Sequence, residues 1–339
     1  MQKKPTIYDI AKELNVAIST VSRSLNDSDL ISDETKERVW ETARKLNYRP
    51  NKLASSLSSG KSYIVGVIIP SAQIQFFSAV INSLERALQK EGYSVLLYQS
   101  NESTKSEISG IQTLVEARVD GIIISPSLET YNFDVINRIH AEGLPILLFD
   151  RIDDGLDLPS VSIDDEKAGF IATKHLIDQG YKRIAYISTS STIQIFRNRC
   201  KGYRRALEEH GIPIKDDMII LDELSIQGGI AGTRKLMAMP EKPDAIIGGD
   251  DFTALGIIKE LSLMGLMPPK IGVIGFANQT FSEYITPGLS TIDQQAIKMG
   301  KECASLFLKI VHKKLSYKPI EKVVLNPILV ERQSSVRTK

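Results

Sequence analysis

Cysteine is scarce in this sequence, and long hydrophobic runs are missing. Cys200 and Cys303 are the only cysteines among 339 residues, and their wide spacing gives neither a disulfide framework nor a thiolate metal site. No stretch approaches the roughly eighteen consecutive apolar residues of a membrane-spanning helix. The first ten residues, MQKKPTIYDI, lack the apolar core of a signal peptide. We therefore expect a soluble, cytoplasmic protein without a membrane partner.

The motifs of common enzyme chemistry are also missing. The sequence has no G-x-G-x-x-G after a strand-like run, no G-x-x-x-x-G-K-[ST] and no H-E-x-x-H. Its four histidines are scattered without ligand spacing, and the paired aspartates at 153/154, 164/165, 216/217 and 250/251 are typical of turns and strand ends. An enzyme such as a metal-dependent hydrolase is the weakest interpretation, and we expect no cofactor and no bound metal.

Charge is almost balanced over the whole chain but is unevenly distributed. There are 42 basic and 41 acidic residues in total. Residues 1–62 hold 11 Lys and Arg against 8 Asp and Glu, whereas the remainder holds 31 against 33. A modestly basic head on a slightly acidic body is compatible with phosphate contacts confined to one end.

Two short amphipathic segments stand back to back in residues 6–26, TIYDIAKELNVAISTVSRSLN. Thr6 with Asp9 three residues on resembles a capping box. Apolar residues recur at spacings of three and four in both segments, which predicts two helices that share a core; they are Ile7, Ile10, Ala11 and Leu14, then Val16, Val21 and Leu25. The turn between the segments, Leu14-Asn15-Val16, is short enough to make a tight corner.

The second segment exposes short hydrogen-bonding side chains and one guanidinium, namely Ile18, Ser19, Thr20, Ser22 and Arg23. A helix with this surface can enter the major groove of DNA and contact base edges. The alternative is a helical hairpin whose polar face is merely solvated. A third helix is predicted from Ser32, with two acids in its first turn and a core-facing side made of Val39, Trp40, Ala43 and Leu46.

From residue 63 onward, short β-branched runs alternate with segments of helical period. The strand-like runs are 64–69, 95–98, 121–125, 146–149, 184–187, 245–248 and 271–275, and the helical segments include 79–91, 167–179, 202–210 and 253–264. This alternation predicts parallel sheets covered by helices on both faces. The strands are too many for one tidy sheet, so we expect two α/β subdomains.

The sequence resembles the LacI/GalR family of bacterial transcription regulators. The matching elements are T-I-x-D-I-A-x-x-x-x-V, S-x-x-T-V-S-R-x-L-N and Y-R-P-N-x-L-A-x-S-L in the first sixty residues, followed by body motifs such as R-x-x-G-Y at Arg199 and T-I-D-Q at Thr291. The resemblance implies an all-α helix-turn-helix headpiece with a hinge helix, followed by a type I periplasmic-binding-protein-like core of two doubly wound parallel-sheet lobes.

The same resemblance implies the domain boundaries. The headpiece would span 1–49 and the hinge 50–62. The N-terminal lobe would hold 63–162 and about 293–323, and the C-terminal lobe 163–292 and about 324–339. The chain would cross between lobes near Ser162, Ile292 and Val324.

Within the head, Ile18, Ser19 and Arg23 are the candidates for base-edge contacts, with Thr20 beside them, and Arg23 could bond a guanine through both of its terminal nitrogens. Phosphate contacts are expected from Thr6, Ser22, Asn26 and Tyr48. By resemblance, the hinge residues Asn51, Leu53, Ala54 and Leu57 also contact DNA, and Leu57 wedges between base pairs in the minor groove. The alternative for Leu57 is a linker residue packed on the body.

By resemblance, the cleft between the lobes binds a small molecule. The candidates, matched position by position, are Phe76, Phe77, Asp150, Arg151, Arg199, Asp251 and Asn278. Aromatic and polar groups after strand ends suit a sugar, although the two phenylalanines could be core and Arg199 could pair with a surface acid. Two departures leave the ligand open: Ala277 stands where many members carry an acid, and Gln75 stands where many carry proline.

The expected function is sequence-specific transcriptional regulation. We expect a repressor that leaves its operator when a sugar-like effector binds. A homodimer would bind a near-palindromic operator, and the C-terminal residues have no leucine heptads for a tetramer. One alternative is a sugar-binding transport component, which leaves the first sixty residues unexplained. Another replaces the sugar with a phosphoprotein or a phosphorylated metabolite as corepressor.

Overall fold

The computed structural model describes residues 5–25, 27–48, 61–153, 155–191, 193–312 and 320–337. The chain divides into two compact units, 1–62 and 63–339, and each is described by itself. The hinge helix expected within 50–62 falls almost entirely outside the described residues. So do five candidate DNA contacts, namely Asn26, Asn51, Leu53, Ala54 and Leu57.

Three short helices form the first unit: α1 (Ile7–Leu14), α2 (Ile18–Leu25) and α3 (Asp33–Lys45). The predicted capping box is confirmed, because the backbone N–H and the hydroxyl of Thr6 both donate to Asp9 Oδ2 at 2.7 Å. Ser32 precedes α3 and accepts a hydrogen bond from the N–H of its third residue.

The three helices pack around one small apolar cluster, whose buried members are Ile10, Ala11, Val21, Val39 and Ala43. The apolar spacing therefore predicted this core correctly, with one exception. Trp40 was expected to face it but is 38% exposed. Val39 and Ala43 lie one turn apart and already fill the buried face of α3, whereas Trp40 is rotated away from that face.

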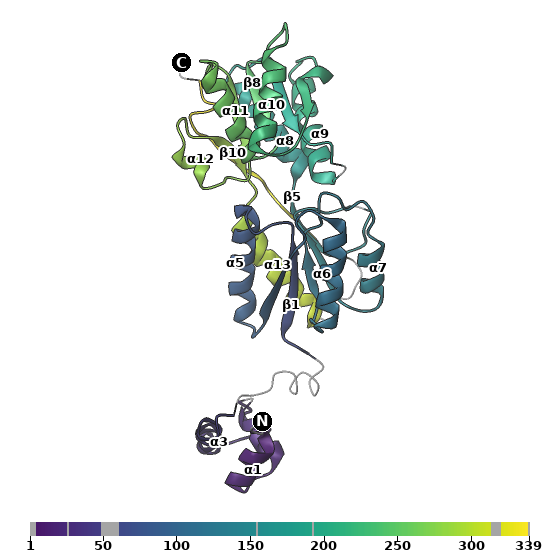
Figure 1. Ribbon diagram of the computed structural model, residues 1–339, viewed down its shortest axis with the longest axis vertical. Helices are drawn as coiled ribbons and strands as arrows, with labels where there is room; N and C mark the ends of the chain where they lie inside the picture. The colour runs from purple at the N-terminus through teal and green to yellow at the C-terminus, as the bar shows by residue number, and fades with distance from the viewer. Residues whose placement is uncertain are drawn as a thin grey trace. The chain divides into compact units, whose positions relative to one another are not determined.

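The second unit begins with an all-parallel sheet of order β11-β5-β4-β3-β1-β2. Its strands are β1 (Ile64–Ile69), β2 (Ser94–Gln99), β3 (Ile122–Ile124), β4 (Ile146–Phe149), β5 (Ser160–Ile163) and β11 (Lys322–Leu325). The helices of this lobe are α5 (Gln75–Gln89), α6 (Thr104–Glu116), α7 (Asp134–Ala141) and α13 (Ala296–Val311). Figure 1 shows them on both sides of the sheet.

Alternate residues along the central strands of this lobe pack against different helices. Val65 and Val67 of β1 share a core with Leu84 of α5 and Phe307 of α13. Ile68 of β1 instead belongs to a core with residues of α6 and α7. Both faces of the sheet are buried, as a doubly wound fold requires.

The second lobe contains a sheet of order β12-β10-β9-β8-β6-β7. Its strands are β6 (Ile184–Ser188), β7 (Ile219–Leu221), β8 (Ala245–Gly248), β9 (Gly272–Phe276), β10 (Ser290–Asp293) and β12 (Ile328–Val330). All neighbours run parallel except β12, which pairs antiparallel with β10. The helices are α8 (Asp165–Asp178), α9 (Gln194–Glu209), α10 (Ile226–Met237), α11 (Asp251–Leu263) and α12 (Phe281–Tyr284), with a short 3₁₀ turn at Asp216–Met218.

The seven predicted strands are all present, and the sheet assignments show where the chain changes lobe. β5 and β11 lie in the first sheet, whereas β10 and β12 lie in the second. The crossings therefore follow Ile163, Asp293 and Leu325, each within a few residues of the expected position. Two boundaries differ more. α9 begins at Gln194 and not at 202, and β11 extends two residues beyond 323, the expected end of the N-terminal lobe segment.

Candidate functional site

Helix α2 of the first unit presents Ile18, Ser19 and Arg23 to solvent, and Ile18 is 37% exposed. Thr20 and Ser22 are half-buried, as is Tyr48, which packs against the headpiece core. The Thr6 hydroxyl is already bonded to Asp9, so a phosphate contact there would compete with the helix cap. The structure thus exposes the three residues that we expect to contact bases.

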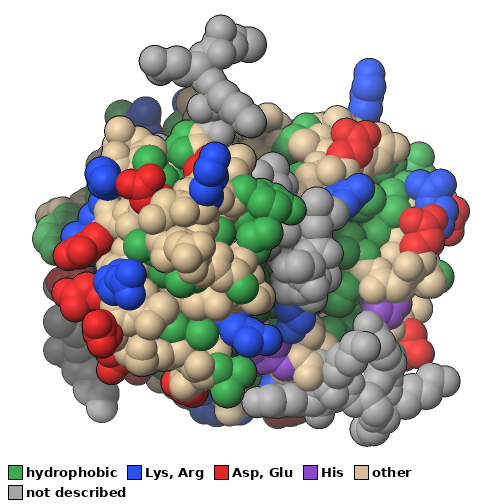
Figure 2. Space-filling view, turned by 90° about the horizontal axis from the view of Figure 1, so that it is seen from below, with side chains coloured by type: hydrophobic (Ala, Val, Ile, Leu, Met, Phe, Trp, Pro, Cys, Tyr) green, Lys and Arg blue, Asp and Glu red, His purple; other side chains and the backbone are tan. Residues whose placement is uncertain are grey.

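Basic and acidic side chains are interspersed over the face of the molecule shown in Figure 2. No large area of one charge is visible on that face. The positive balance of residues 1–62 is likewise small.

In the second unit, Arg199 of α9 lies at the centre of a buried polar group and is 3% exposed. Its Nε donates to Asp165 Oδ1 at 2.8 Å, and its Nη1 donates to the Gly249 carbonyl at 3.3 Å. The guanidinium carbon lies 4.7 Å from the centre of the Phe276 ring. Arg199 thus pairs with a buried acid and not with a surface one. Its Nη2 is buried and has no hydrogen-bond partner among the described residues.

Two glycines bring the pair Arg199 and Asp165 together, because they allow α8 and α9 to touch backbone to backbone. A Cβ on Gly202 would lie 1.9 Å from the Glu166 carbonyl oxygen, and one on Gly169 would lie 2.0 Å from the Arg199 carbonyl oxygen. Any larger residue would separate the helices. Burial raises the pKa of Asp165 above its usual value, against the opposing effect of Arg199.

Asp150 follows β4 in the first lobe and is also buried. Its backbone has φ +60°, a left-handed conformation that is uncommon for residues other than glycine. Gln294, just after β10, lies with its Nε2 3.5 Å from Asp150 Oδ1. Burial raises the pKa of Asp150, while the charges of Arg151 and Arg199 act to lower it. The Asp150 carboxyl group of the first lobe and the Arg199 guanidinium of the second therefore interact electrostatically.

Arg151, expected as a ligand contact, is largely bound by protein groups. It makes a two-pronged ion pair with Glu102, with Nη1–Oε2 at 2.6 Å and Nη2–Oε1 at 2.9 Å. Its Nη1 also donates to the Pro126 carbonyl at 3.0 Å. These groups occupy both terminal nitrogens, so Arg151 holds protein loops in place, whereas its buried Nε has no hydrogen-bond partner among the described residues. Glu102 was missed because no motif marks it.

Phe76 and Phe77 are both buried in the core of the first lobe. Their rings meet edge to face at 5.2 Å, and Phe77 lies 6.2 Å from Phe149 in the same manner. The packing favours the core alternative for both residues. Phe77 still contacts the cleft region through the Arg151 guanidinium, 5.7 Å from its ring centre.

Asp251 and Asn278 bind groups of their own lobe. Asp251 is fully buried and accepts hydrogen bonds from the Thr291 hydroxyl, the Gln279 N–H and the Ser282 hydroxyl at 2.6–2.9 Å. Asn278 donates to Asp293 and accepts from Arg332. At Asp251 the three protein donors favour a structural role, and a ligand contact of either residue stays a prediction.

Gln75 connects the lobes, which the sequence did not predict. Its side-chain amide donates to the Thr280 hydroxyl, and its carbonyl oxygen accepts the Thr280 N–H at 2.7 Å. Gln75 and residues 277–279 were noted separately as departures from the family pattern. The structure shows that Gln75 bonds to Thr280, the residue that follows residues 277–279.

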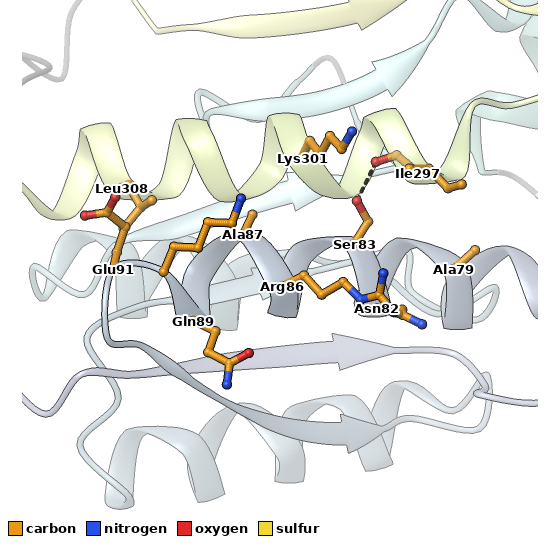
Figure 3. Close-up of a pocket in the computed structure, with 11 residues that line it drawn as sticks. Ala79, Asn82, Ser83, Arg86, Ala87, Gln89, Glu91, Ile297, Lys301 and Leu308 are labelled. Carbon is orange, nitrogen blue, oxygen red and sulfur yellow. Dashed lines mark hydrogen bonds between the residues drawn. The ribbon is translucent and has the colours of Figure 1, made fainter.

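Two hollows accompany these contacts. A cavity of about 200 Å³ opens between the lobes, lined by Thr130, Arg151 and Asp153 on one side and by Gln194 and Arg197 on the other. A larger groove of about 950 Å³ runs between α5 and α13 in the first lobe. Figure 3 shows its lining side chains on the two facing helices, joined by the hydrogen bond from the Ser83 hydroxyl to the Ile297 carbonyl.

Two further kinds of site are missing from the described ranges. Within them, no group of three or more His, Cys, Asp or Glu side chains is placed to hold a metal ion. Within the same ranges, no helix has the length and apolar character needed to cross a membrane.

Comparisons with known proteins match this arrangement. Residues 6–51 match the family described as bacterial regulatory proteins, lacI family, and residues 62–323 match periplasmic binding proteins and sugar binding domain of LacI family. Catabolite control protein A of Priestia megaterium is 34% identical over 310 residues, 91% of this chain and 93% of that protein.

Two solved structures have the same fold. The lac repressor dimer bound to operator and an anti-inducer matches with a TM-score of 0.87 and 24% identity, covering 99% of this chain and 100% of that one. A ribose-bound LacI family regulator of Enterococcus faecium matches with a TM-score of 0.71 and 27% identity, covering 81% and 100%. The relatives are transcriptional regulators and not enzymes, and the chain belongs to the LacI family of DNA-binding transcriptional regulators.

Proposed function

We propose that this regulator is a repressor whose operator binding is controlled by a small molecule, a sugar or sugar derivative, bound between the two lobes. The observation that carries the proposal is the buried Arg199 guanidinium with one unpartnered nitrogen. A buried donor of this kind costs free energy unless a partner accepts from it. A ligand hydroxyl or carboxylate would supply that acceptor.

The surrounding groups support a polyhydroxylated ligand. Asp150 offers carboxylate oxygens and Gln294 offers an amide, and they come from opposite ends of the body sequence. The Phe276 ring beside Arg199 adds an apolar face. Sugars bind where hydroxyl-bonding groups adjoin such a face. The ribose-bound relative is a sugar binder of the same fold.

The ligand would act by shifting an equilibrium between two lobe arrangements. It changes that equilibrium only by binding one arrangement more tightly than the other. Since Arg199 belongs to the second lobe and Asp150 to the first, a ligand that contacts both favours the arrangement in which they are close. We propose that this arrangement releases the operator.

Helix α2 supports the proposed binding of operator DNA. Arg23 and Ser19 are exposed on one face of a short helix that follows a tight turn, and Arg23 can reach a guanine edge with two hydrogen bonds. A homodimer would place two such helices on a near-palindromic operator. The edge strand β2 exposes Leu96 and Leu97, which supports pairing of two copies through this side of the first lobe.

A thermal-shift screen of the full chain against sugars, sugar phosphates and nucleobases would identify the ligand class, because binding raises apparent stability by mass action. For a ligand found in this way, Arg199→Ala should weaken binding by about a hundredfold or more, as loss of a buried charged contact does. Gln294→Ala should weaken it less and leaves the Arg199–Asp165 pair intact. Arg204→Ala on the same helix removes a surface ion pair and is the matched control. Unchanged affinity in both cleft variants would refute the ligand site.

A phosphoprotein coregulator is a second candidate, favoured by the groove between α5 and α13. Arg86, Lys90 and Lys301 line it and have no ion-pair partner among the residues that the structure describes. Ile297 at its rim is largely exposed. A phosphorylated acidic surface would match these charges. Lys301→Glu should then abolish coregulation while leaving ligand binding in the cleft unchanged.

A further inference from the structure

The loop after β3, residues 125–131, is held by two acidic side chains of the segment that follows β2. Glu107 accepts from the Ser127 N–H at 2.6 Å, from the Ser127 hydroxyl at 2.8 Å and from the Thr130 hydroxyl at 3.0 Å. Glu102 accepts the Leu128 N–H at 2.8 Å. Backbone and side-chain donors of the loop thus end on carboxylates, which fixes its conformation.

Glu102 itself is unusually constrained. It adopts φ +62°, directly after Asn101 at φ +50°, and a left-handed backbone is unfavourable for a glutamate. Its carboxylate is kept in place by the two-pronged ion pair with Arg151. One oxygen, Oε2, therefore bonds Arg151 of the strand-end segment and Leu128 of the loop at the same time.

Leu128 is where this loop meets the other lobe. Its carbonyl accepts a hydrogen bond from the Ser191 hydroxyl at 3.3 Å. Its side chain packs on an apolar cluster of the second lobe formed by Ile193, Ile195 and Phe196, with Leu224 beside them. Leu128 is thus held by Glu102 on its N–H side and contacts the second lobe through its carbonyl and its side chain.

Each side of this contact adjoins one of the proposed ligand residues. Arg151, the partner of Glu102, directly follows Asp150 in sequence. Phe196 of the apolar cluster has its ring centre 5.8 Å from the Arg199 guanidinium carbon. A change in separation of the lobes at Leu128 would therefore alter the spacing of the groups that face the cleft.

We infer that Glu102 is a positioning residue of the effector cleft: together with Arg151 it fixes the loop so that Leu128 docks on the Ile193–Phe196 cluster and holds the two lobes closed. The inference rests on the proposed function for its biological meaning. The docking of Leu128 itself is a property of the ligand-free chain and is tested without a ligand.

The first measurement is hydrogen exchange of the peptide that contains Leu128 in the full-length protein. Glu102→Gln keeps the shape of the side chain but removes its charge, so exchange of this peptide should rise by about tenfold or more. Glu116→Gln, an exposed acid at the end of α6, is the matched control and should leave it unchanged. Unaltered exchange in Glu102→Gln would overturn the clamp.

The second measurement is the distance between spin labels at Asn137→Cys and Glu208→Cys, one in each lobe, in a Cys200→Ser background diluted with unlabelled protein. Both Glu102→Gln and Leu128→Ala should shift the distance distribution to longer values. If Glu102 acts through Leu128, the double variant should resemble Leu128→Ala alone. Additive shifts, or an unchanged distribution in Leu128→Ala, would contradict the inference. A failed ligand screen would refute the proposed function and leave these label distances interpretable.

Discussion

At the scale of single residues, the buried charged side chains of this regulator are hydrogen-bonded mainly by protein groups. Asp251 accepts three hydrogen bonds, from Gln279, Ser282 and Thr291, and Arg151 donates to a carboxylate and a carbonyl. One nitrogen of each arginine, Nε of Arg151 and Nη2 of Arg199, is buried without a hydrogen-bond partner among the described residues. Under the proposed function, the Arg199 nitrogen is the one that a bound ligand would satisfy.

The carboxyl group of Asp251 should make stability depend on pH. Burial raises its pKa from 3.8 to about 7. Between these values the folded state binds a proton that the unfolded state has released, so this group's stabilisation is complete at low pH and is lost as pH rises through 7. Urea unfolding of the wild type and of Asp251→Asn at pH 5, 6, 7 and 8 would measure it. The advantage of the wild type should shrink as pH rises, and a constant difference would contradict the expectation.

Gln75 offers a test of contact between the lobes with little risk to the fold. It is the first residue of α5, a position where proline is well tolerated because no intrahelical hydrogen bond is lost. Gln75→Pro should change the melting temperature by only a few degrees but remove both bonds to Thr280. Hydrogen exchange of residues 277–282 should therefore increase. Gln89→Ala, at the exposed far end of α5, is the control.

At the scale of elements, the contact between α8 and α9 sets the position of Arg199. Gly202→Ala would place a methyl group against the Glu166 backbone, so the helices must separate at a cost of about 2–3 kcal/mol. Gly232→Ala in α10 is the matched control, because its neighbour is the flexible tip of Ile187. Denaturant unfolding would give both values. A loss at Gly202 no greater than that at Gly232 would show that the close approach is not needed.

The elements also show which features a single sequence reveals. Runs such as 64–69 and 245–248 are continuous and β-branched, so their strands were predicted. β5 was not among the predicted strands, because it is short and reads Ser-Val-Ser-Ile. Its serines are nevertheless buried. The first two turns of α9 are mostly polar, so their helical period was weak. Arg199 was predicted as a site residue from a motif. The roles of Glu102 and Gln75 depend on contacts between distant segments, so a single sequence could not predict them.

At the scale of the whole molecule, the described direct hydrogen bonds between the lobes are few. Gln75 bonds Thr280, and Ser191 bonds Leu128. Each such bond contributes only about 1 kcal/mol, so a ligand with a moderately higher affinity for one lobe arrangement can shift the equilibrium. Under the proposed function, a ligand would act against these few hydrogen bonds and the apolar contacts that the lobes share.

The division into two compact units leads to the last prediction. The body has its own extensive core, in residues 63–339, and the headpiece has a separate small one. A chain that lacks residues 1–62 should therefore fold, bind the cleft ligand with unchanged affinity and remain a dimer, because the proposed pairing surface on β2 is retained. It should lose operator binding completely. Sedimentation, calorimetry and a gel-shift titration beside the full chain measure these outcomes. A monomeric body would place the dimer contacts in the removed segment and overturn the assignment of β2.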